Sequence, residues 1–260
     1  VKRPHGIILV TGPTGSGKTT TLYSTLRRVA TEEVNVSTIE DPIERIDPAL
    51  NQTQVQPQLD FSFAEGVRAL MRQDPDIIMI GEIRDLETAE MAIQAALTGH
   101  LVLSTLHTND APSAVTRLLD LGVPAYLISS TLLGVMAQRL VRTLCPHCKQ
   151  SAPISESERQ VWRSLVHPWK ANEPTQLHHA VGCLECRMTG YSGRVGVYEI
   201  LLNTPSVRGQ IRPGAEIPRL REQAFREGMR PLRISGALKV AQGLTTLEEL
   251  MKQVPPAEIE

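Results

Sequence analysis

One glycine-rich motif near the start of the chain constrains its fold more than any other feature. Residues 12–19 match the pattern G-x-x-x-x-G-K-[ST] at every position, and they directly follow the apolar run 6–10. A strand, a glycine turn and a helix are the context that this phosphate-binding loop requires. Backbone N–H groups of the turn and the positive end of the helix attract phosphate oxygens. The motif therefore predicts a nucleoside triphosphate site, with Lys18 at the β- and γ-phosphates and the Thr19 hydroxyl on Mg²⁺. The residues expected to bind the nucleotide are Gly12, Pro13, Thr14, Gly15, Ser16, Gly17, Lys18, Thr19 and Thr20.

Short apolar runs alternate with helical patterns after this loop. The patterns predict strands over 34–39, 77–80 and 101–106, and helices over 20–30, 63–72 and 88–97. The polar stretch 47–58 contains two prolines and is predicted to be a loop. Buried runs that alternate with helices indicate a parallel sheet covered on both faces. We therefore predict an α/β fold in which the nucleotide lies at the carboxyl ends of the strands.

Polar residues suited to phosphate chemistry follow three of these strands. Glu82 comes after the strand 77–80, and Glu40, Asp41 and Glu44 come after the strand 34–39. Hydrolysis needs a metal to neutralise phosphate charge and a carboxylate to orient and deprotonate water. Either acidic segment alone is weak evidence, because surface loops contain acidic residues routinely. His107 follows the strand 101–106, where it can hydrogen-bond a γ-phosphate or be an ordinary loop histidine.

All four cysteines occur in two C-x-x-C pairs. Such pairs can hold Zn²⁺ tetrahedrally, because each tight turn directs two thiolates at one point. The interval 149–182 is longer than the ~15 to 20 residues of a compact zinc ribbon, and a helix over 155–166 accounts for the extra length. Disulfides and a redox-active C-x-x-C are the alternatives, and neighbouring histidines can replace a ligand. The expected ligands are Cys145, Cys148, Cys183 and Cys186, and the histidines are His147, His178 and His179.

Composition argues against two classes of partner. Lys and Arg total 27 against 28 Asp and Glu, and the chain has only 3 Phe, 2 Trp and 4 Tyr. A nucleic-acid-binding protein generally shows a basic balance or aromatic residues among basic ones, so no nucleic acid is expected. No apolar stretch reaches the ~18 to 20 residues that span a bilayer, and no signal-peptide pattern is present. Any membrane association is therefore expected to come through partners.

Four segments taken together resemble, in order and spacing, the secretion ATPase superfamily, whose members drive type II secretion, type IV pilus extension and retraction, and type IV secretion. In that family the segments are called Walker A, the Asp box, Walker B and the His box. The resemblance implies a RecA-like ATPase core that hydrolyses ATP with Mg²⁺. Glu44 is the favoured general base, Glu82 supports Mg²⁺ and water, and which of the two takes the proton stays open. The matching segments are 12–19, 38–44, 72–89 and 98–109, and the implied catalytic residues are Lys18, Glu44, Glu82 and His107.

The segments around the cysteines narrow the choice inside that family. Residues 139–148 and 182–199 resemble the tetracysteine element of type II secretion and pilus-extension ATPases, which retraction ATPases typically lack. The resemblance implies a structural Zn²⁺, since four cysteines leave no open coordination position. The expected function is ATP hydrolysis by a hexameric motor that drives pseudopilus assembly in type II secretion. The alternatives are a type IV pilus assembly ATPase, a DNA-handling RecA-like motor, and a zinc-organised nucleotide-binding scaffold without turnover.

The predicted organisation has three parts. They are a RecA-like core over 1–140, a tetracysteine zinc-binding element with return strands over 141–200, and a C-terminal helical subdomain over 201–260. Within the last part, Thr245 or Thr246 is the expected N-cap of a terminal helix. We expect the chain to be a piece of a longer protein, with arginines that reach the γ-phosphate lying upstream of Val1, and with Arg84, Arg139 and Arg142 in structural or subunit-contact roles. The resemblance implies a homohexamer in the full-length protein, inner-membrane platform and cytoplasmic-domain partners, and a cytoplasmic location at the inner membrane.

Overall fold

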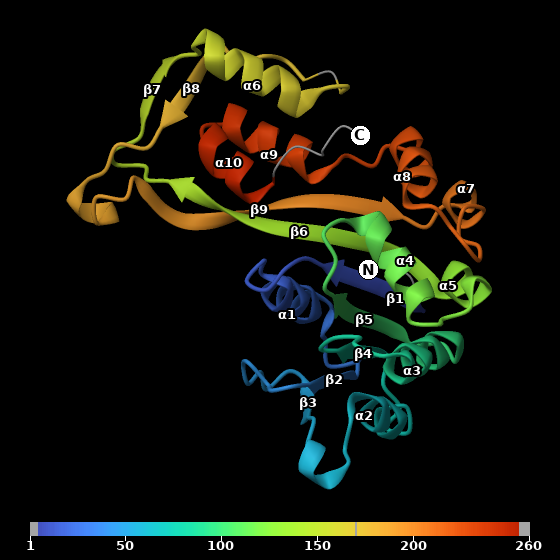
Figure 1. The fold of residues 1–260 in the computed structure, drawn as a ribbon. Helices are drawn as coiled ribbons and strands as arrows, with labels where there is room; N and C mark the ends of the chain where they lie inside the picture. The colour runs from blue at the N-terminus through green and yellow to red at the C-terminus, as the bar shows by residue number, and fades with distance from the viewer. Residues whose placement is uncertain (1–4, 170, 255–260) are drawn as a thin grey trace. The chain divides into compact units, whose positions relative to one another are not determined.

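The computed structural model describes residues 5–169 and 171–254, and the chain divides into two compact units. The first comprises 1–137 and 200–229, and the second comprises 138–199 and 230–260. Two long strands, β6 (Leu132–Leu144) and β9 (Tyr191–Leu202), pass from one unit into the other (Figure 1). The three-part division expected from the sequence stays a prediction.

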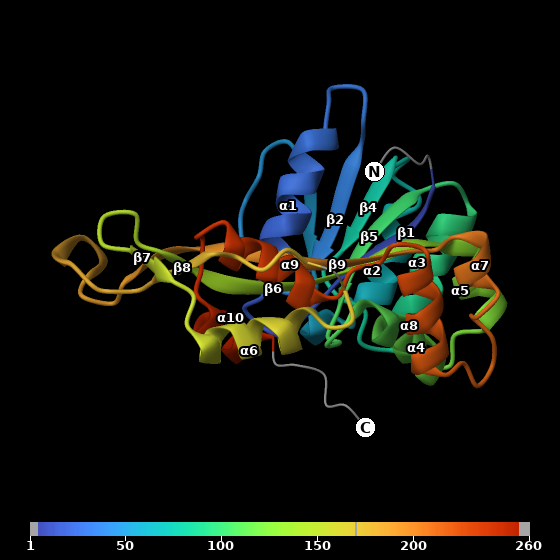
Figure 2. The same cartoon turned by 90° about the horizontal axis from the view of Figure 1, so that it is seen from above.

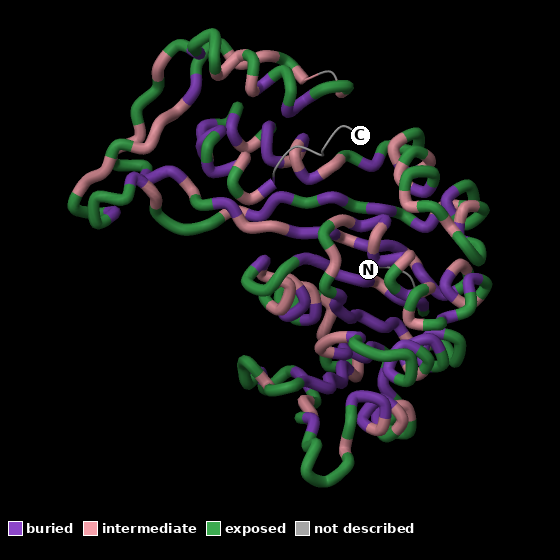
Figure 3. The backbone as a smooth tube through the Cα atoms, viewed as in Figure 1, coloured by how far each residue is buried: buried purple, intermediate pink, exposed green. Residues whose placement is uncertain are grey.

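A seven-stranded sheet with the order β3-β2-β4-β5-β1-β6-β9 forms the scaffold of the first unit. Neighbouring strands from β3 through to β6 pair in parallel, and this confirms the predicted α/β class with a mostly parallel sheet. Strands β1, β2, β4 and β5 are almost wholly buried (Figure 3), as expected of parallel strands covered on both faces. Besides β6 and β9, the strands are β1 (Gly6–Thr11), β2 (Val36–Glu40), β3 (Asn51–Gln54), β4 (Ile77–Ile80) and β5 (Leu101–Leu106).

Helices cover both faces of this sheet (Figures 1 and 2). Helix α1 (Lys18–Val29) packs Leu22 and Leu26 into a core with Val10 and Leu103, which point to one face. Helices α2 and α3 lie on the opposite side of the sheet in both views. The other elements of this unit are η1 (Pro57–Leu59), α2 (Phe63–Leu70), α3 (Leu86–Leu97), α4 (Ala111–Asp120), α5 (Ala125–Thr131), α7 (Pro205–Arg208) and α8 (Ile217–Arg226). No helix in the described part of the chain has both the length and the apolar character needed to cross a bilayer.

The prediction of a loop over 47–58 is wrong, because this stretch contains strand β3 and the short helix η1. The strand pairs only with β2 and lies at the edge of the sheet, where its side chains are partly or fully exposed. An exposed edge strand needs no apolar alternation, so the polar residues 51–54 carried no strand pattern. The apolar residues that flank the strand, Leu50 and Val55, are buried.

Among the described residues, the second unit combines a small two-stranded sheet with three α-helices and one short 3-10 helix. Its elements are β7 (Gln150–Pro153), α6 (Glu156–Val166), β8 (Gln176–His179), η2 (Leu184–Cys186), α9 (Leu232–Ala241) and α10 (Leu247–Gln253). Strands β7 and β8 pair antiparallel, and Trp162 of α6 is fully buried. The predicted helix over 155–166 is confirmed, with Ser155 and Glu158 forming a capping box. Thr246 is the N-cap of α10, as expected, because its hydroxyl accepts from the backbone N–H of Glu249 at 3.1 Å.

An ion pair between a half-exposed arginine and a buried glutamate fastens α10 to β6 in this unit. Glu249, whose side chain is 1% exposed, accepts from the guanidinium of Arg142 at 2.7 and 2.8 Å and from the Arg142 backbone N–H at 3.1 Å. The guanidinium also lies 4.0 Å from the ring centre of Tyr191. Burial raises the pKa of Glu249, but the hydrogen bonds from Arg142 outweigh burial and leave this pKa below its usual range. Arg142 therefore has a defined partner, Glu249, in line with the structural role expected for it.

Replacing Arg142 with Met should lower the free energy of unfolding by about 2 kcal/mol near neutral pH, because Glu249 then stays buried without its cation. A carboxylate whose pKa is lowered by folding stabilises above its unfolded pKa of ~4.3 and loses that contribution as the pH falls through the folded value. The difference in the free energy of unfolding between wild type and Arg142→Met should therefore shrink below about pH 4. Denaturant unfolding at several pH values measures this, with the exposed pair Arg219–Glu216 as control: Arg219→Met should change stability by less than ~0.5 kcal/mol.

Candidate functional site

The register of the sheet gathers the predicted catalytic segments at one edge. Thr11 of β1 lies beside Leu106 of β5, so the chain leaves these strands together at Gly12 and His107. Ile80 of β4 lies beside both Ser104 of β5 and Ile39 of β2. The segments that carry Glu82 and Glu44 therefore leave the sheet at that same edge, which is the carboxyl edge expected for a nucleotide site.

The glycine loop adopts a conformation that depends on its glycines. Gly15 and Gly17 have φ angles of 79° and 86°, a region that other residues rarely adopt, and Gly17 is the N-cap of α1. The Lys18 ammonium donates to the carbonyl oxygens of Gly12 at 2.8 Å and Pro13 at 3.2 Å, so the lysine folds back along its own loop. The loop is thus shaped to direct backbone N–H groups and one lysine toward an anion. The other predicted nucleotide-binding residues, Thr14, Ser16, Thr19 and Thr20, lie in the same loop and the first turn of α1.

Glu44 lies in an exposed loop directly beside the start of α1. Its carboxylate accepts a hydrogen bond from the Thr19 hydroxyl at 3.3 Å. Most residues between Asp41 and Ile46 are exposed (Figure 3), in contrast to strand β2, which precedes them. The structure therefore brings together the residue expected to hold Mg²⁺ and the residue expected to act as general base.

Glu82 and His107 form a second group at this edge. The Nε2 atom of His107 lies 3.4 Å from Glu82 Oε2, and Arg84 bonds the other carboxylate oxygen. Arg84 also lies 3.5 Å from Asp41 in the loop after β2. The hydrogen bond to Glu82, together with the charges of nearby acids, raises the pKa of Arg84 above its usual value. Glu82 is largely buried, with a side chain 17% exposed, so its carboxylate has a fixed position.

Two hydroxyl groups that sequence reasoning missed connect the His107 segment to the glycine loop. The Thr11 and Thr108 hydroxyls lie 2.7 Å apart, and Thr11 Oγ1 accepts from the backbone N–H of Thr108 at 2.9 Å. Thr11 is buried and directly precedes the loop motif. The only sequence signal that could have identified Thr11 was its position as the last strand residue before the motif. Threonine is common in strands, so this position alone does not indicate a functional residue.

The four cysteines form one cluster in the second unit. The sulfur atoms lie 3.7–3.9 Å apart for three of the pairs, and all four lie within 4.8 Å of one another. Four sulfurs at ~2.3 Å from a central Zn²⁺ stand ~3.8 Å apart, so the spacing fits a tetrahedral site. All four are free thiols, and they are the only group of three or more potential metal ligands in the part of the chain described.

Backbone N–H groups point at these sulfurs. Cys148 Sγ accepts from Gly182 at 3.3 Å, and Cys186 Sγ accepts from Cys183 and Gly190 at 3.2 Å each. Burial raises the pKa of the Cys186 thiol, but these hydrogen bonds and the neighbouring sulfurs lower it to about 6. Donors that stabilise a thiolate are what a metal-binding cysteine requires. The predicted ligands therefore fit a metal, and His147, His178 and His179 are not needed to complete the set.

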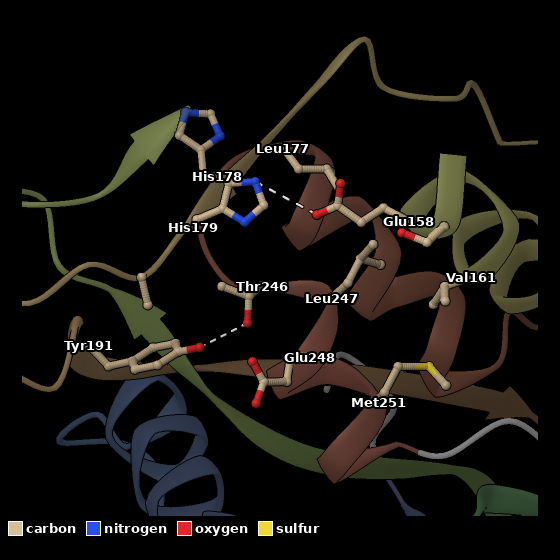
Figure 4. A pocket seen from close by; sticks show the side chains of 12 residues that line it. Glu158, Val161, Leu177, His178, His179, Tyr191, Thr246, Leu247, Glu248 and Met251 are labelled. Carbon is tan, nitrogen blue, oxygen red and sulfur yellow. Dashed lines mark hydrogen bonds and ion pairs between the residues drawn. The ribbon is translucent and has the colours of Figure 1, made fainter. Parts of the chain in front are cut away.

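A separate cavity of about 430 Å³ lies in the same unit, lined by α6, β8 and the start of α10 (Figure 4). His179 faces Glu158 across 3.7 Å, and Tyr191 bonds the Thr246 hydroxyl at 2.9 Å. Its lining includes none of the four cysteines and none of the predicted nucleotide-site residues. The cavity therefore belongs to neither candidate site.

A family model for type II/IV secretion system proteins matches residues 1–252. The chain belongs to this family. The type IV pilus assembly ATPase TfpB of Acinetobacter baylyi is 58% identical over 98% of this chain and 43% of that protein. The type II secretion system ATPase E of Vibrio cholerae is 52% identical over 97% of this chain and 49% of its own length. The chain thus spans about half the length of the curated relatives it matches, and the family predicted from the sequence is confirmed.

Solved structures of family proteins share this fold. The pilus retraction motor PilT with bound ADP has a TM-score of 0.70 and 32% identity, covering 98% of this chain and 63% of that chain. The ATPase DotB of Legionella pneumophila has a TM-score of 0.69 and 26% identity, covering 96% of this chain and 60% of its own. Both similarities extend over nearly the whole chain, which supports the α/β fold class.

Proposed function

We propose that the full-length protein containing this chain is an ATPase motor, and that this chain supplies its nucleotide site. The observation that carries the proposal is the Thr19–Glu44 contact, which joins the phosphate-binding loop to an exposed carboxylate at the carboxyl edge of the sheet. A loop that binds phosphates and an acid that can activate water are the two parts that hydrolysis requires. Similarity to PilT, whose structure holds ADP, supports the same nucleotide chemistry.

Each residue has a distinct part in the proposed reaction. Lys18 neutralises the β- and γ-phosphates, for which it must leave the loop carbonyls that it now contacts. Glu44 accepts a proton from the attacking water, while Glu82 orients that water and His107 lies within reach of Glu82. Bound Mg²⁺ would neutralise phosphate charge, with the Thr19 hydroxyl as its ligand from the loop. The buried position of Glu82 and the exposed position of Glu44 favour Glu44 as the group that exchanges protons with solvent.

The proposed Zn²⁺ has a structural role only. Cys145, Cys148, Cys183 and Cys186 would hold it, and four thiolates leave no position open for substrate. The cysteine pairs follow β6 and precede β9, so the metal would fasten the two chain segments that enter and leave this part of the second unit.

Pseudopilus assembly in type II secretion is the proposed cellular process, supported by the similarity to the ATPase of Vibrio cholerae. Type IV pilus assembly is the second candidate, favoured by the 58% identity to TfpB. Deletion of the gene separates the two: loss of protein secretion with intact surface pili supports the first, and loss of pili with intact secretion supports the second. Loss of neither would contradict both.

A homohexamer on an inner-membrane platform, at the cytoplasmic side, is the proposed assembly of the full-length protein. Family membership supports this assembly. The assembly is proposed for the full-length protein because this chain spans only about half the length of its relatives. Purified full-length protein should hydrolyse ATP in a Mg²⁺-dependent reaction. Absence of phosphate release from a hexameric preparation would favour the non-hydrolysing scaffold instead, whereas stimulation by single-stranded DNA would favour the DNA-handling motor.

A further inference from the structure

A buried polar cluster lies beneath the loop that carries Glu44. Its members are Tyr23 of α1, Thr38 and Glu40 of β2, and Gln52 of β3. The Tyr23 hydroxyl donates to Glu40 Oε2 and the Thr38 hydroxyl to Glu40 Oε1, each at 2.6 Å. Glu40 is 3% exposed, whereas Glu44 is exposed. The two glutamates of this segment therefore have different environments, although the sequence presents them as equivalent acids.

This cluster holds the backbone of the Glu44 loop after Glu44, and Gln54 of β3 holds it before Glu44. Gln52 Nε2 donates to the carbonyl oxygen of Arg45 at 2.9 Å. Tyr23 Oη lies 3.0 Å from the same oxygen, but its single proton is directed at Glu40, which is nearer at 2.6 Å. Gln52 Oε1 accepts from the backbone N–H of Asp47 at 2.7 Å, and its Nε2 donates to the Tyr23 hydroxyl at 2.8 Å. On the other side of Glu44, the backbone N–H of Ile43 donates to Gln54 Oε1 at 3.2 Å.

Helix α1 joins this cluster to the phosphate-binding loop. Thr19 and Tyr23 are four residues apart and therefore lie on the same face of the helix. Thr19 contacts the Glu44 side chain, and Tyr23 contacts the backbone of the next residue, Arg45. Burial raises the pKa of Tyr23, and the hydrogen bond to Glu40 raises it further, so the phenol keeps its donor proton across the physiological range.

We propose that Tyr23 and Gln52 are positioning residues that fix Glu44 relative to the phosphate-binding helix. The proposal rests on the proposed function, in which Glu44 is the general base. Neither residue touches the reacting atoms. Gln52 holds the Arg45 and Asp47 backbone directly, and through it the carboxylate of Glu44. Tyr23 donates to Glu40 and accepts from Gln52 Nε2, so it fixes the amide that holds the loop. A misplacement of about 1 Å at a reacting group can cost about 100-fold in rate, which sets the size of the effect.

Tyr23→Phe removes one hydroxyl and leaves the buried ring in place. In full-length protein we expect kcat for ATP to fall about 10- to 100-fold, while KM and the affinity for ADP stay within about 2-fold. Gln52→Leu should have the same signature. Tyr126, which is 70% exposed on α5, provides the matched control, and Tyr126→Phe should leave kcat unchanged.

A double mutant distinguishes positioning from a general structural defect. If Tyr23 acts through Glu44, adding Tyr23→Phe to Glu44→Gln should leave the residual rate unchanged, because the lost effects are not additive. A further drop in rate, or a loss of ADP affinity in Tyr23→Phe alone, would overturn the proposal. So would a wild-type kcat in Tyr23→Phe.

Amide hydrogen exchange in the full-length protein gives a readout that does not depend on turnover. Exchange over residues 43–47 should be faster in Tyr23→Phe than in wild type and unchanged in Tyr126→Phe. If the full-length wild-type protein hydrolyses no ATP, the proposed function fails, and exchange still decides whether Tyr23 orders the loop. Unchanged exchange over 43–47 would contradict the proposal whatever the activity.

Discussion

Cys186→Ser is expected to abolish zinc binding and to unfold the region around the cysteine cluster. Wild-type protein purified under reducing conditions should contain about one zinc per chain, and the variant should contain almost none. Apparent binding free energies of structural Zn²⁺ are about 10–16 kcal/mol in zinc-finger peptides, and that energy contributes directly to folding. The large expected effect follows from the sulfur spacing of 3.7–3.9 Å in three pairs and the free thiols, because no disulfide links the four cysteines when the metal is lost.

Metal analysis and proteolysis of the second unit measure this effect. His147→Ala and His178→Ala are matched controls that should retain full zinc, because the four sulfurs already complete a tetrahedral set. Zinc loss in either histidine variant would reassign a ligand. Wild-type protein without zinc would contradict the metal proposal altogether. ADP binding by the first unit should be little affected in Cys186→Ser, since none of the nucleotide-site residues lies in the second unit.

The sequence predicted those strands and helices whose hydrophobic pattern matches their burial in the structure. Buried strands β1, β4 and β5 are continuous apolar runs, and the glycine loop requires a strand before it and a helix after it. Strand β3 was missed because an exposed edge strand needs no apolar pattern. The length of β6 was likewise not evident, because it combines apolar positions with Gln138, Arg139 and Arg142, and the partner of Arg142 is Glu249 of α10.

The candidate site was predictable as a set of residues but not as a geometry. Strand ends and motif spacing place Lys18, Glu44, Glu82 and His107 at one edge of the sheet. What spacing cannot provide is the environment of each acid. Glu40 and Glu44 look alike in sequence, but Glu40 is a buried hydrogen-bond acceptor because Thr38 of its own strand and Tyr23 and Gln52 of two other elements donate to it. Such long-range pairing depends on the packing of α1 and β3 against β2.

Glu44→Gln should lower kcat for ATP in the full-length protein by about 10²- to 10⁴-fold, the range typical of a lost general base. The amide keeps the shape of the side chain and can still accept a hydrogen bond from Thr19, but it cannot take a proton from water. Affinity for ADP should therefore stay near the wild-type value. Steady-state phosphate release and equilibrium binding of ADP measure the two quantities separately.

Lys18→Ala provides the contrasting variant, because it removes the charge expected at the β- and γ-phosphates and should weaken ADP binding as well as turnover.

Glu82→Gln should resemble Glu44→Gln in losing turnover. The Glu82 carboxylate, however, is largely buried beside Arg84 and His107 and is less suited to release a proton to solvent. The pH dependence of the residual rate distinguishes the two acids. A general base leaves a limb in the acidic range of the kcat profile that disappears when that base is removed. If this limb persists in Glu44→Gln and is lost in Glu82→Gln, then Glu82 is the base; a wild-type rate in Glu44→Gln would exclude Glu44 from the role.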